Sequence, residues 1–267
     1  MRKISDLADL TGRTALITGG TGHVGRAMAE ALAEQGARII LLDLDENHAQ
    51  EVASSISSAY GVEALGIGVD LENEEAVLSV PASLGAITDS LDVLVNNAAF
   101  CGTTSLKGWG VPFEDQSVGT WRRALEVNLT AVFALTQCCL PLLKKSNQAS
   151  VINVSSIYGV LGPDLSLYEG TSMGNPGAYA ASKGGLTQLT RWLSTVLAPD
   201  VRVNTISPGG IARGQSLDFQ DRYIKKVPMQ RMGTEEDMKG ITLFLASDLS
   251  AYITGQNFMV DGGFSSW

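Results

Sequence analysis

The sequence is poor in histidine and cysteine, the side chains that most often bind metals or act as nucleophiles. Two histidines and three cysteines occur in 267 residues, and the cysteines form neither a disulfide framework nor a zinc-site spacing. A cluster of several histidines around a metal is therefore excluded, and we expect no bound metal. A Ser-His-Asp triad would have only His23 or His48 to draw on. The chemistry of this chain must rest on other side chains.

The chain also lacks long apolar runs and an excess of basic residues. No segment approaches the roughly 18 consecutive apolar residues that a membrane helix needs, and the first residues lack the apolar core of a signal peptide. Acidic residues outnumber basic ones by 28 to 19, and the formal charge of −9 has the wrong sign for a nucleic-acid partner. We expect a cytoplasmic protein without a membrane or nucleic-acid partner.

The chain does contain a regular alternation of short β-prone runs and helical stretches. Helical periodicity appears, for example, at 26–35, 48–60 and 179–196. This alternation predicts one α/β domain over residues 1–267, with a doubly wound, seven-stranded parallel sheet of the Rossmann type and helices on both faces. The seven β-prone runs lie at 14–18, 37–42, 64–69, 91–95, 150–154, 201–206 and 257–260.

Three turn-rich segments follow predicted strands, near 100–117, 160–176 and 210–232. Ligands of doubly wound sheets bind beyond the carboxyl ends of the strands, so these loops are expected on the substrate side. Their aromatic and hydrogen-bonding side chains favour a small, polar, hydroxylated substrate over a steroid or a long acyl chain. Arg213 has a second interpretation, a salt bridge with a nearby acid. The candidate substrate contacts are Trp109, Tyr168, Asn175 and Arg213.

A glycine-rich turn lies between the first predicted strand and the first predicted helix. Residues 18–25 read Thr-Gly-Gly-Thr-Gly-His-Val-Gly, and such glycines let backbone N–H groups and the helix N-terminus face a pyrophosphate. Asp43 ends the next strand, where a carboxylate can bind ribose hydroxyls and repel a 2′-phosphate. We therefore expect NAD rather than NADP, although Asp45 could take this role. The alternative is a plain turn, with Asp43 capping a helix.

Tyr179 and Lys183 are spaced four residues apart on a predicted helix, which places them on one face. A phenol titrates near pH 10 and is a poor proton shuttle at neutral pH unless a nearby cation stabilises its ionised form. The Lys183 ammonium is suitably placed for that purpose. The pair can therefore act as a general acid and base.

Together these motifs resemble the short-chain dehydrogenase/reductase family over residues 12–263. The resemblance implies that this chain interconverts a secondary alcohol and a ketone with NAD. It implies that Ser156 bonds the reacting oxygen, that Lys183 binds the nicotinamide ribose and lowers the pKa of Tyr179, and that Asn128 supports a proton-relaying water. The implied catalytic residues are Asn128, Ser156, Tyr179 and Lys183.

The same resemblance implies a set of cofactor contacts and a homotetramer or homodimer. Asn97 and Ala98 stand in a motif after the fourth predicted strand, and Pro208 and Gly209 form a turn after the sixth. The expected cofactor-binding residues are Gly19, Thr21, Gly22, His23, Val24, Gly25, Asp43, Leu44, Asp70, Leu71, Asn97, Ala98, Tyr179, Lys183, Pro208, Gly209 and Ile211.

Three features depart from the family pattern. His23 replaces a glycine of the turn, Arg213 stands where the family often has threonine, and residues 162–176 contain an insertion before Tyr179. Segments at 157–163 and 168–171 resemble the enzymes of bacterial polysaccharide or flagellin-sugar modification, which implies a sugar-derived substrate. Two other functions stay open: an epimerase or dehydratase that retains NAD, and a dinucleotide-binding regulator without catalysis.

Overall fold

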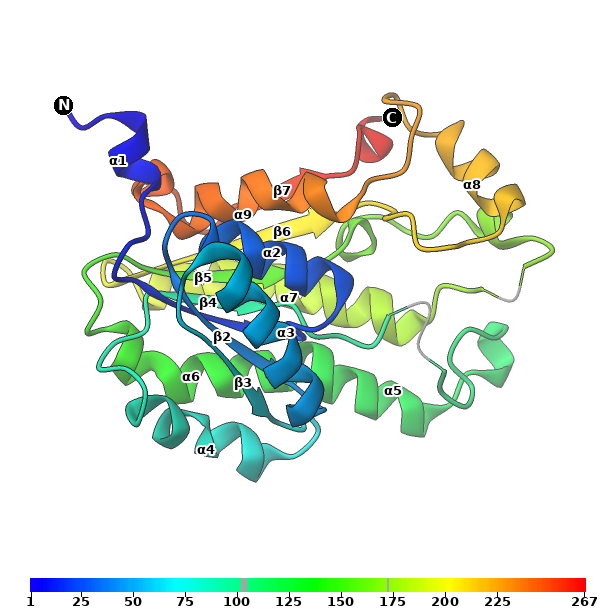
Figure 1. The fold of residues 1–267 in the computed structure, drawn as a ribbon. Helices are drawn as coiled ribbons and strands as arrows, with labels where there is room; N and C mark the ends of the chain where they lie inside the picture. Colours follow the sequence, from blue (N-terminus) through cyan, green and yellow to red (C-terminus); the bar gives the residue numbers. More distant parts are fainter. Residues whose placement is uncertain (102–104, 172) are drawn as a thin grey trace.

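The seven expected strands form one parallel sheet in the order β3-β2-β1-β4-β5-β6-β7 (Figure 1). The computed structural model describes residues 1–101, 105–171 and 173–267, so the loops expected near 100–117 and 160–176 are each described in part. The strand order reverses between β1 and β4, where doubly wound sheets bind ligands. The strands are β1 Thr14–Thr18, β2 Arg38–Asp43, β3 Ala64–Gly68, β4 Val93–Asn96, β5 Ala149–Val154, β6 Val201–Pro208 and β7 Asn257–Val260.

Successive side chains of the central strands enter opposite halves of the core. In β1, Ala15 and Ile17 belong to one hydrophobic cluster and Leu16 to the other. In β2, Ile39 and Ile40 are divided in the same way, and all of these side chains are fully buried. A strand covered on both faces is apolar throughout, which explains why these runs lack polar alternation.

Helices cover both faces of the sheet, as Figure 1 shows. Residues of α2, α3 and α9 contribute to one hydrophobic cluster, and residues of α4, α6 and α7 to the other. The expected single-domain, doubly wound fold is therefore confirmed. The helices are α1 Ile4–Ala8, α2 His23–Ala33, α3 Glu46–Tyr60, α4 Glu74–Gly85, α5 Val118–Leu125, α6 Ala131–Leu143, α7 Gly177–Val196, α8 Leu217–Ile224 and α9 Lys239–Ala246.

α2 and α3 begin earlier than their periodicity predicts, because a glycine and an aspartate before them act as N-caps. α2 begins at His23 because the extended backbone of Gly22 occupies the N-cap position. α3 begins at Glu46 because the Asp45 carboxylate accepts a hydrogen bond from the His48 backbone N–H at 3.1 Å. Asp45 is therefore a helix cap, and Asp43 remains the acid at the strand end.

α5, a π-helical turn at Glu126–Thr130 and α6 form one continuous helical stretch that is long and apolar enough to cross a membrane. The core helix of an α/β protein meets the same criterion. Here Ala131, Leu135 and Leu142 on the inner side of α6 pack in the hydrophobic core against the sheet. The apolar character of this stretch is explained by its place between the sheet and α4.

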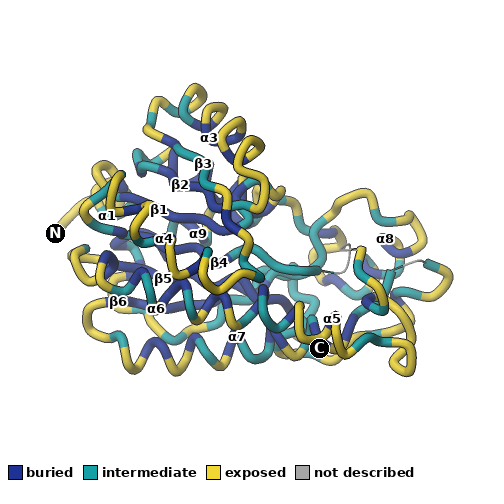
Figure 2. Tube along the Cα trace, turned by 90° about the horizontal axis from the view of Figure 1, so that it is seen from below, coloured by how far each residue is buried: buried dark blue, intermediate teal, exposed yellow. Residues whose placement is uncertain are grey.

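A small lobe lies beyond the carboxyl ends of the strands, around α8 and the segment that follows β5 (Figure 1). It has a core of its own, and the Phe219 ring lies 5.5 Å from the Tyr168 ring. Figure 2 shows the contrast between the buried strands and the exposed outer faces of the helices. The buried residues of the lobe core are Leu167, Phe219, Tyr223, Val227 and Met232.

Candidate active site

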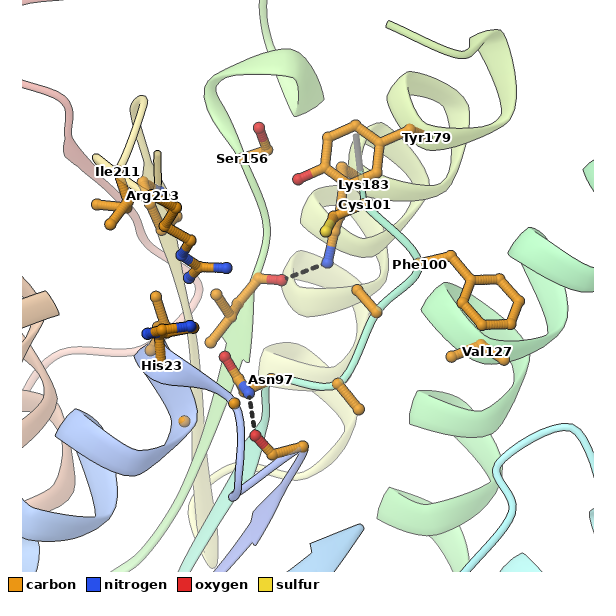
Figure 3. A pocket seen from close by; sticks show the side chains of 18 of the residues that line it. His23, Asn97, Phe100, Cys101, Val127, Ser156, Tyr179, Lys183, Ile211 and Arg213 are labelled. Atoms are coloured by element: carbon orange, nitrogen blue, oxygen red, sulfur yellow. Dashed lines mark hydrogen bonds between the residues drawn. The ribbon is translucent and has the colours of Figure 1, made fainter. Parts of the chain in front are cut away.

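One large cavity of about 790 Å³ opens at the carboxyl ends of β1, β2, β4, β5 and β6. Its walls include the glycine turn before α2, the ends of β2 and β4, the segment after β5, the first turns of α7 and the lobe (Figure 3). All seventeen residues expected to contact the cofactor line this cavity. The topology therefore brings together motifs that lie up to 190 residues apart in the sequence, from Gly19 to Pro208 and Gly209.

The glycine turn is held tightly by its own backbone and by Asn97. Gly19 has a φ of +62°, a conformation that residues with a side chain rarely adopt. A Cβ at Gly25 would lie 2.2 Å from the Gly19 carbonyl oxygen, so only glycine permits this approach of helix to turn. The Asn97 amide donates to the Thr18 and Gly19 carbonyls, each at 3.0 Å. The α2 N-terminus is thereby fixed facing the cavity, as a pyrophosphate site requires.

The Asp43 carboxylate points into the same end of the cavity. One oxygen accepts from the Thr21 backbone N–H at 3.0 Å and from the Thr21 hydroxyl at 2.6 Å. The other accepts from the Leu44 N–H at 2.8 Å, and the Leu44 side chain is exposed at the cavity edge. These bonds fix both oxygens of the carboxylate.

The Asp43 end of the cavity carries more negative than positive charge. Asp70, Leu71 and Glu72 line it after β3, and Arg123 is paired with Glu72 through bonds of 2.7 and 3.0 Å. The Arg123 guanidinium also lies 5.5 Å from the centre of the Phe100 ring. Among the described residues that line the cavity, no lysine or arginine makes a hydrogen bond or ion pair with Asp43.

Ser156, Tyr179 and Lys183 lie together at the end of the cavity opposite Asp43. The Ser156 hydroxyl oxygen accepts from the Tyr158 N–H at 3.2 Å and forms a hydrogen bond with the Tyr179 phenol. The Lys183 ammonium donates to the Val154 carbonyl at 2.7 Å and lies 5.8 Å from the centre of the Tyr179 ring. Figure 3 shows the Tyr179 hydroxyl directed toward Ser156, with Lys183 beside it. The spacing of Tyr179 and Lys183 thus places both on the cavity side of α7, as expected.

Burial dominates the proton affinities of this pair. It raises the pKa of Tyr179 to about 12, against the opposing hydrogen bond with Ser156, and it lowers the pKa of Lys183 to about 8. In this structure the Lys183 ammonium donates to the Val154 carbonyl, and the expected lowering of the Tyr179 pKa by Lys183 remains a prediction.

Asn128 lies in the π-helical turn and is fully buried. Its carbonyl oxygen accepts from the Phe100 N–H at 2.8 Å, and its amide donates to the Phe100 carbonyl and to the Ser182 hydroxyl. The side chain does not line the cavity. The structure therefore gives Asn128 a positioning role, because it ties the loop after β4 to α7, and the expected water relay remains a prediction.

Two departures from the family pattern meet beside the glycine turn. One Glu235 carboxylate oxygen lies 3.5 Å from His23 Nδ1 and 3.8 Å from Arg213 Nε. Both His23 and Arg213 line the cavity, on the side opposite Lys183 and Tyr179 in Figure 3. The salt-bridge interpretation of Arg213 thus has a partner, at a distance that leaves the guanidinium free to contact a ligand.

The lobe closes the substrate end of the cavity. Tyr168 and Asn175 line it as expected, but Trp109 does not. Trp109 is 2% exposed, its indole N–H donates to the Cys101 carbonyl at 2.7 Å, and it packs against Ala178. The expected substrate contact at Trp109 is therefore wrong, because this aromatic ring anchors the loop instead.

Several cavity residues were not anticipated from the sequence. Tyr158 stands only two positions after Ser156, and that closeness was a signal that its side chain reaches the same cavity. The residues of α8 gave no such signal, because an aromatic pair at helical spacing also fits an ordinary core. The unanticipated residues at the substrate end are Tyr158, Met173, Gln215, Phe219, Tyr223 and Met232.

No cluster of histidine, cysteine or acidic side chains suited to a metal ion occurs in the part of the chain that the structure describes. The groups that face the cavity include hydroxyls, phenols, amides, carboxylates, guanidinium groups and one buried ammonium. They suit the binding of a dinucleotide and the transfer of a proton to or from an alcohol oxygen.

Replacement of Lys183 by methionine should change how stability depends on pH. Since burial lowers the Lys183 pKa from 10.5 to about 8, the unfolded chain binds the extra proton between these values and folding carries a penalty below pH 8. The penalty disappears as the pH rises toward 10.5. Between pH 7 and pH 10, the free energy of unfolding of the wild type should therefore rise by roughly 2 to 3 kcal/mol relative to that of the variant. Urea unfolding at both pH values checks this, and a difference independent of pH would contradict it.

Comparisons with known proteins agree with this geometry. A family model described as enoyl-(acyl carrier protein) reductase matches residues 21–265. The 3-oxoacyl-[acyl-carrier-protein] reductase FabG of Aquifex aeolicus is 34% identical over 259 residues, which cover 95% of this chain and 98% of that protein.

Solved structures extend the comparison to the whole fold. The RhlG/NADP active-site complex of Pseudomonas aeruginosa is 32% identical, with a TM-score of 0.86 and coverage of 97% and 98% of the two chains. A gluconate 5-dehydrogenase of Burkholderia cenocepacia, solved with NADP and tartrate, is 27% identical with a TM-score of 0.88, and covers 99% and 100%. With its parallel sheet, glycine turn and Ser156–Tyr179–Lys183 group, this chain belongs to the short-chain dehydrogenase/reductase family and is an oxidoreductase that uses a nicotinamide dinucleotide.

Proposed function

We propose that this protein uses NAD to interconvert a secondary alcohol and a ketone on a small, polar, hydroxylated molecule, for which a sugar derivative is the first candidate. The observation that carries this proposal is the convergence of Ser156, Tyr179 and Lys183 at one end of the cavity whose other end holds the glycine turn and Asp43. A proton-transfer group and a dinucleotide site thus share one space.

The chain's own groups divide the work at the reacting oxygen. The Ser156 hydroxyl oxygen accepts a hydrogen bond from the Tyr158 backbone N–H, and this bond orients the Ser156 hydroxyl. We assign to that hydroxyl a hydrogen bond that holds the substrate oxygen, and to the Tyr179 phenol the transfer of the proton. The nicotinamide, when bound, supplies the acceptor or donor of the hydride.

Lys183 has the capacity for two tasks beyond its bond to Val154. An ammonium carries three N–H donors, and one of them is used by the Val154 carbonyl at 2.7 Å. We assign the remaining donors to the nicotinamide ribose hydroxyls. The positive charge near the Tyr179 ring then favours ionised phenol, which offsets the burial that raises the pKa of Tyr179 to about 12.

The choice of NAD rests on the charges around Asp43. A carboxylate fixed by Thr21 and Leu44 suits the two ribose hydroxyls of NAD as an acceptor and repels the 2′-phosphate of NADP. The RhlG and gluconate 5-dehydrogenase structures contain NADP. For NADP this chain would need a cation near Asp43. The cavity cations Arg123 and Lys183 have hydrogen-bond partners elsewhere, and Arg213 lies beside Glu235.

A substrate screen tests the proposed reaction. Sugars, sugar acids, polyols and simple secondary alcohols are offered with NAD and with NADP in parallel, and the nicotinamide absorbance is followed. We expect net reduction of NAD by a hydroxylated substrate. Turnover without net reduction would instead indicate an epimerase or dehydratase that retains NAD, and dinucleotide binding without any turnover would indicate a regulator.

We also propose that the protein works in the cytoplasm as a homotetramer or homodimer. Support for assembly comes from large apolar side chains that are partly exposed on α5, α6 and α7, namely Trp121, Phe133 and Trp192. Burial of such side chains between subunits removes apolar surface from water. A monomeric mass in light scattering would contradict the assembly.

A further inference from the structure

The insertion before Tyr179 places a small polar group at the substrate end of the cavity. The Tyr158 and Tyr168 hydroxyl oxygens lie 2.8 Å apart, and the Asn175 side chain lies beside Tyr158. All three side chains line the cavity. We call Tyr158, Tyr168 and Asn175 the polar triad. None of the three is needed to explain the transfer of a proton by Tyr179.

A count of donors and acceptors shows what the polar triad leaves unused. Two phenols carry two O–H hydrogens, and one of them is used in the bond between Tyr158 and Tyr168. The Asn175 carbonyl oxygen is buried and has no hydrogen-bond partner among the described residues. One O–H donor and one carbonyl acceptor therefore remain, and a buried acceptor without a partner is costly.

The ionisation state of the polar triad supports this count. Burial and the neighbouring Tyr168 raise the pKa of Tyr158, so this phenol keeps its proton throughout the physiological pH range. The two groups left over are then a neutral donor and a neutral acceptor. An alcohol hydroxyl is the ligand group that donates one hydrogen bond and accepts another, and it matches this pair.

The surroundings of the polar triad are mainly apolar. The Phe219 ring packs on Tyr168 at 5.5 Å, and Met173 and Met232 complete this wall of the cavity. The Tyr223 hydroxyl oxygen accepts the Gly210 N–H at 2.5 Å and keeps its own O–H as a donor. The polar triad thus shares this end of the cavity with the hydrogen-bonding groups of Tyr223, Gln215 and Arg213.

The polar triad also lies close to the reacting groups. The Tyr158 N–H holds the Ser156 hydroxyl oxygen at 3.2 Å, and Tyr168 is near enough to Tyr179 to raise its pKa. We propose that Tyr158, Tyr168 and Asn175 form a subsite that binds a second hydroxyl group of the substrate, close to the carbon that is oxidised. The preferred substrates carry at least one hydroxyl group besides the one that is oxidised. This inference rests on the proposed function and narrows its substrate class.

Matched ring compounds test the subsite. Cyclohexanol is compared with 1,2- and 1,3-cyclohexanediol in cis and trans forms, by saturation-transfer NMR for binding and by NAD reduction for turnover. We expect at least one diol to exceed cyclohexanol by about 10-fold or more in affinity and in kcat/KM, because a built hydrogen-bonding site discriminates strongly against an analogue without the group.

Two variants locate the effect. Asn175→Leu removes the free acceptor at similar size, and Tyr168→Phe removes one of the two phenol hydroxyls of the polar triad. Each should reduce the advantage of the diol over cyclohexanol by about 5- to 10-fold. The exposed residues Asn147 and Tyr252 provide matched controls, Asn147→Leu and Tyr252→Phe. These two variants should leave affinity and kcat/KM unchanged for both the diol and cyclohexanol.

The outcomes separate the subsite from the reaction. Equal binding of cyclohexanol and every diol by the wild type, or a diol advantage that survives in both variants, would overturn the subsite whether or not turnover occurs. A diol advantage in binding that both variants reduce, without any reduction of NAD, would support the subsite and overturn the proposed reaction.

Discussion

Tyr179→Phe lowers kcat by about 1,000-fold and leaves the dissociation constant for NAD within about twofold, if Tyr179 is the group that moves the proton. The magnitude follows from general acid and base catalysis, which contributes roughly 10²- to 10⁴-fold. The substitution removes one hydroxyl and keeps the ring, which packs with Trp109 and Ala178. The fold and the cofactor end of the cavity should therefore persist. Turnover by steady-state kinetics and NAD binding by calorimetry measure the two quantities separately.

Tyr252→Phe is the matched control, because the Tyr252 side chain is fully exposed and does not line the cavity. It should leave both kcat and NAD affinity unchanged. Residual activity of Tyr179→Phe above about one tenth of the wild type would show that another group, such as Tyr168, transfers the proton. Equal losses of kcat and NAD affinity would indicate structural damage instead.

Asp43→Ala should produce the second large effect, a fall of about 100-fold in kcat/KM with NAD and no comparable fall with NADP. Hydrogen bonds to a charged group contribute roughly 1.5 to 3 kcal/mol each, and two ribose hydroxyls lose such a partner. The variant also removes the negative charge that repels a 2′-phosphate. The ratio of kcat/KM values for the two dinucleotides, measured side by side, is the quantity to compare.

Two controls separate the charge of Asp43 from its structural bonds. Thr21→Val removes the 2.6 Å bond from the Thr21 hydroxyl but leaves the carboxylate in place, so it should preserve the preference for NAD. Asp45→Ala removes the cap of α3 and should cost about 1 kcal/mol of stability without a change in cofactor preference. A wild type that prefers NADP would contradict the assignment of Asp43 outright.

The fold was accessible from the sequence because each central strand is buried on both faces. Such strands appear in the sequence as continuous apolar runs, as in β1 and β2. Their regular alternation with helices predicts a parallel sheet. Helix starts were less accessible. They depend on single caps, such as Gly22 before α2 and Asp45 before α3, which periodicity does not detect.

The cofactor end of the site was predictable for a similar reason, since its residues follow strand ends at short and regular distances. The substrate end was not. Trp109 and Tyr168 are both aromatic residues in loops, yet one packs inside the protein and the other lines the cavity. The difference arises from tertiary contacts, namely the bond from Trp109 to Cys101 and the packing of Tyr168 on Phe219. Neither contact leaves a local pattern in the sequence.

The most direct test of the central claim follows a labelled hydrogen from substrate to cofactor. The wild-type enzyme is given NAD and an alcohol substrate found in the screen, with deuterium on its carbinol carbon, and the dinucleotide is examined by mass spectrometry. We predict NADH that contains one deuterium, together with a ketone product, and no transfer when Tyr179→Phe replaces the wild type. Formation of product with unlabelled dinucleotide would contradict the assignment of this site to hydride transfer.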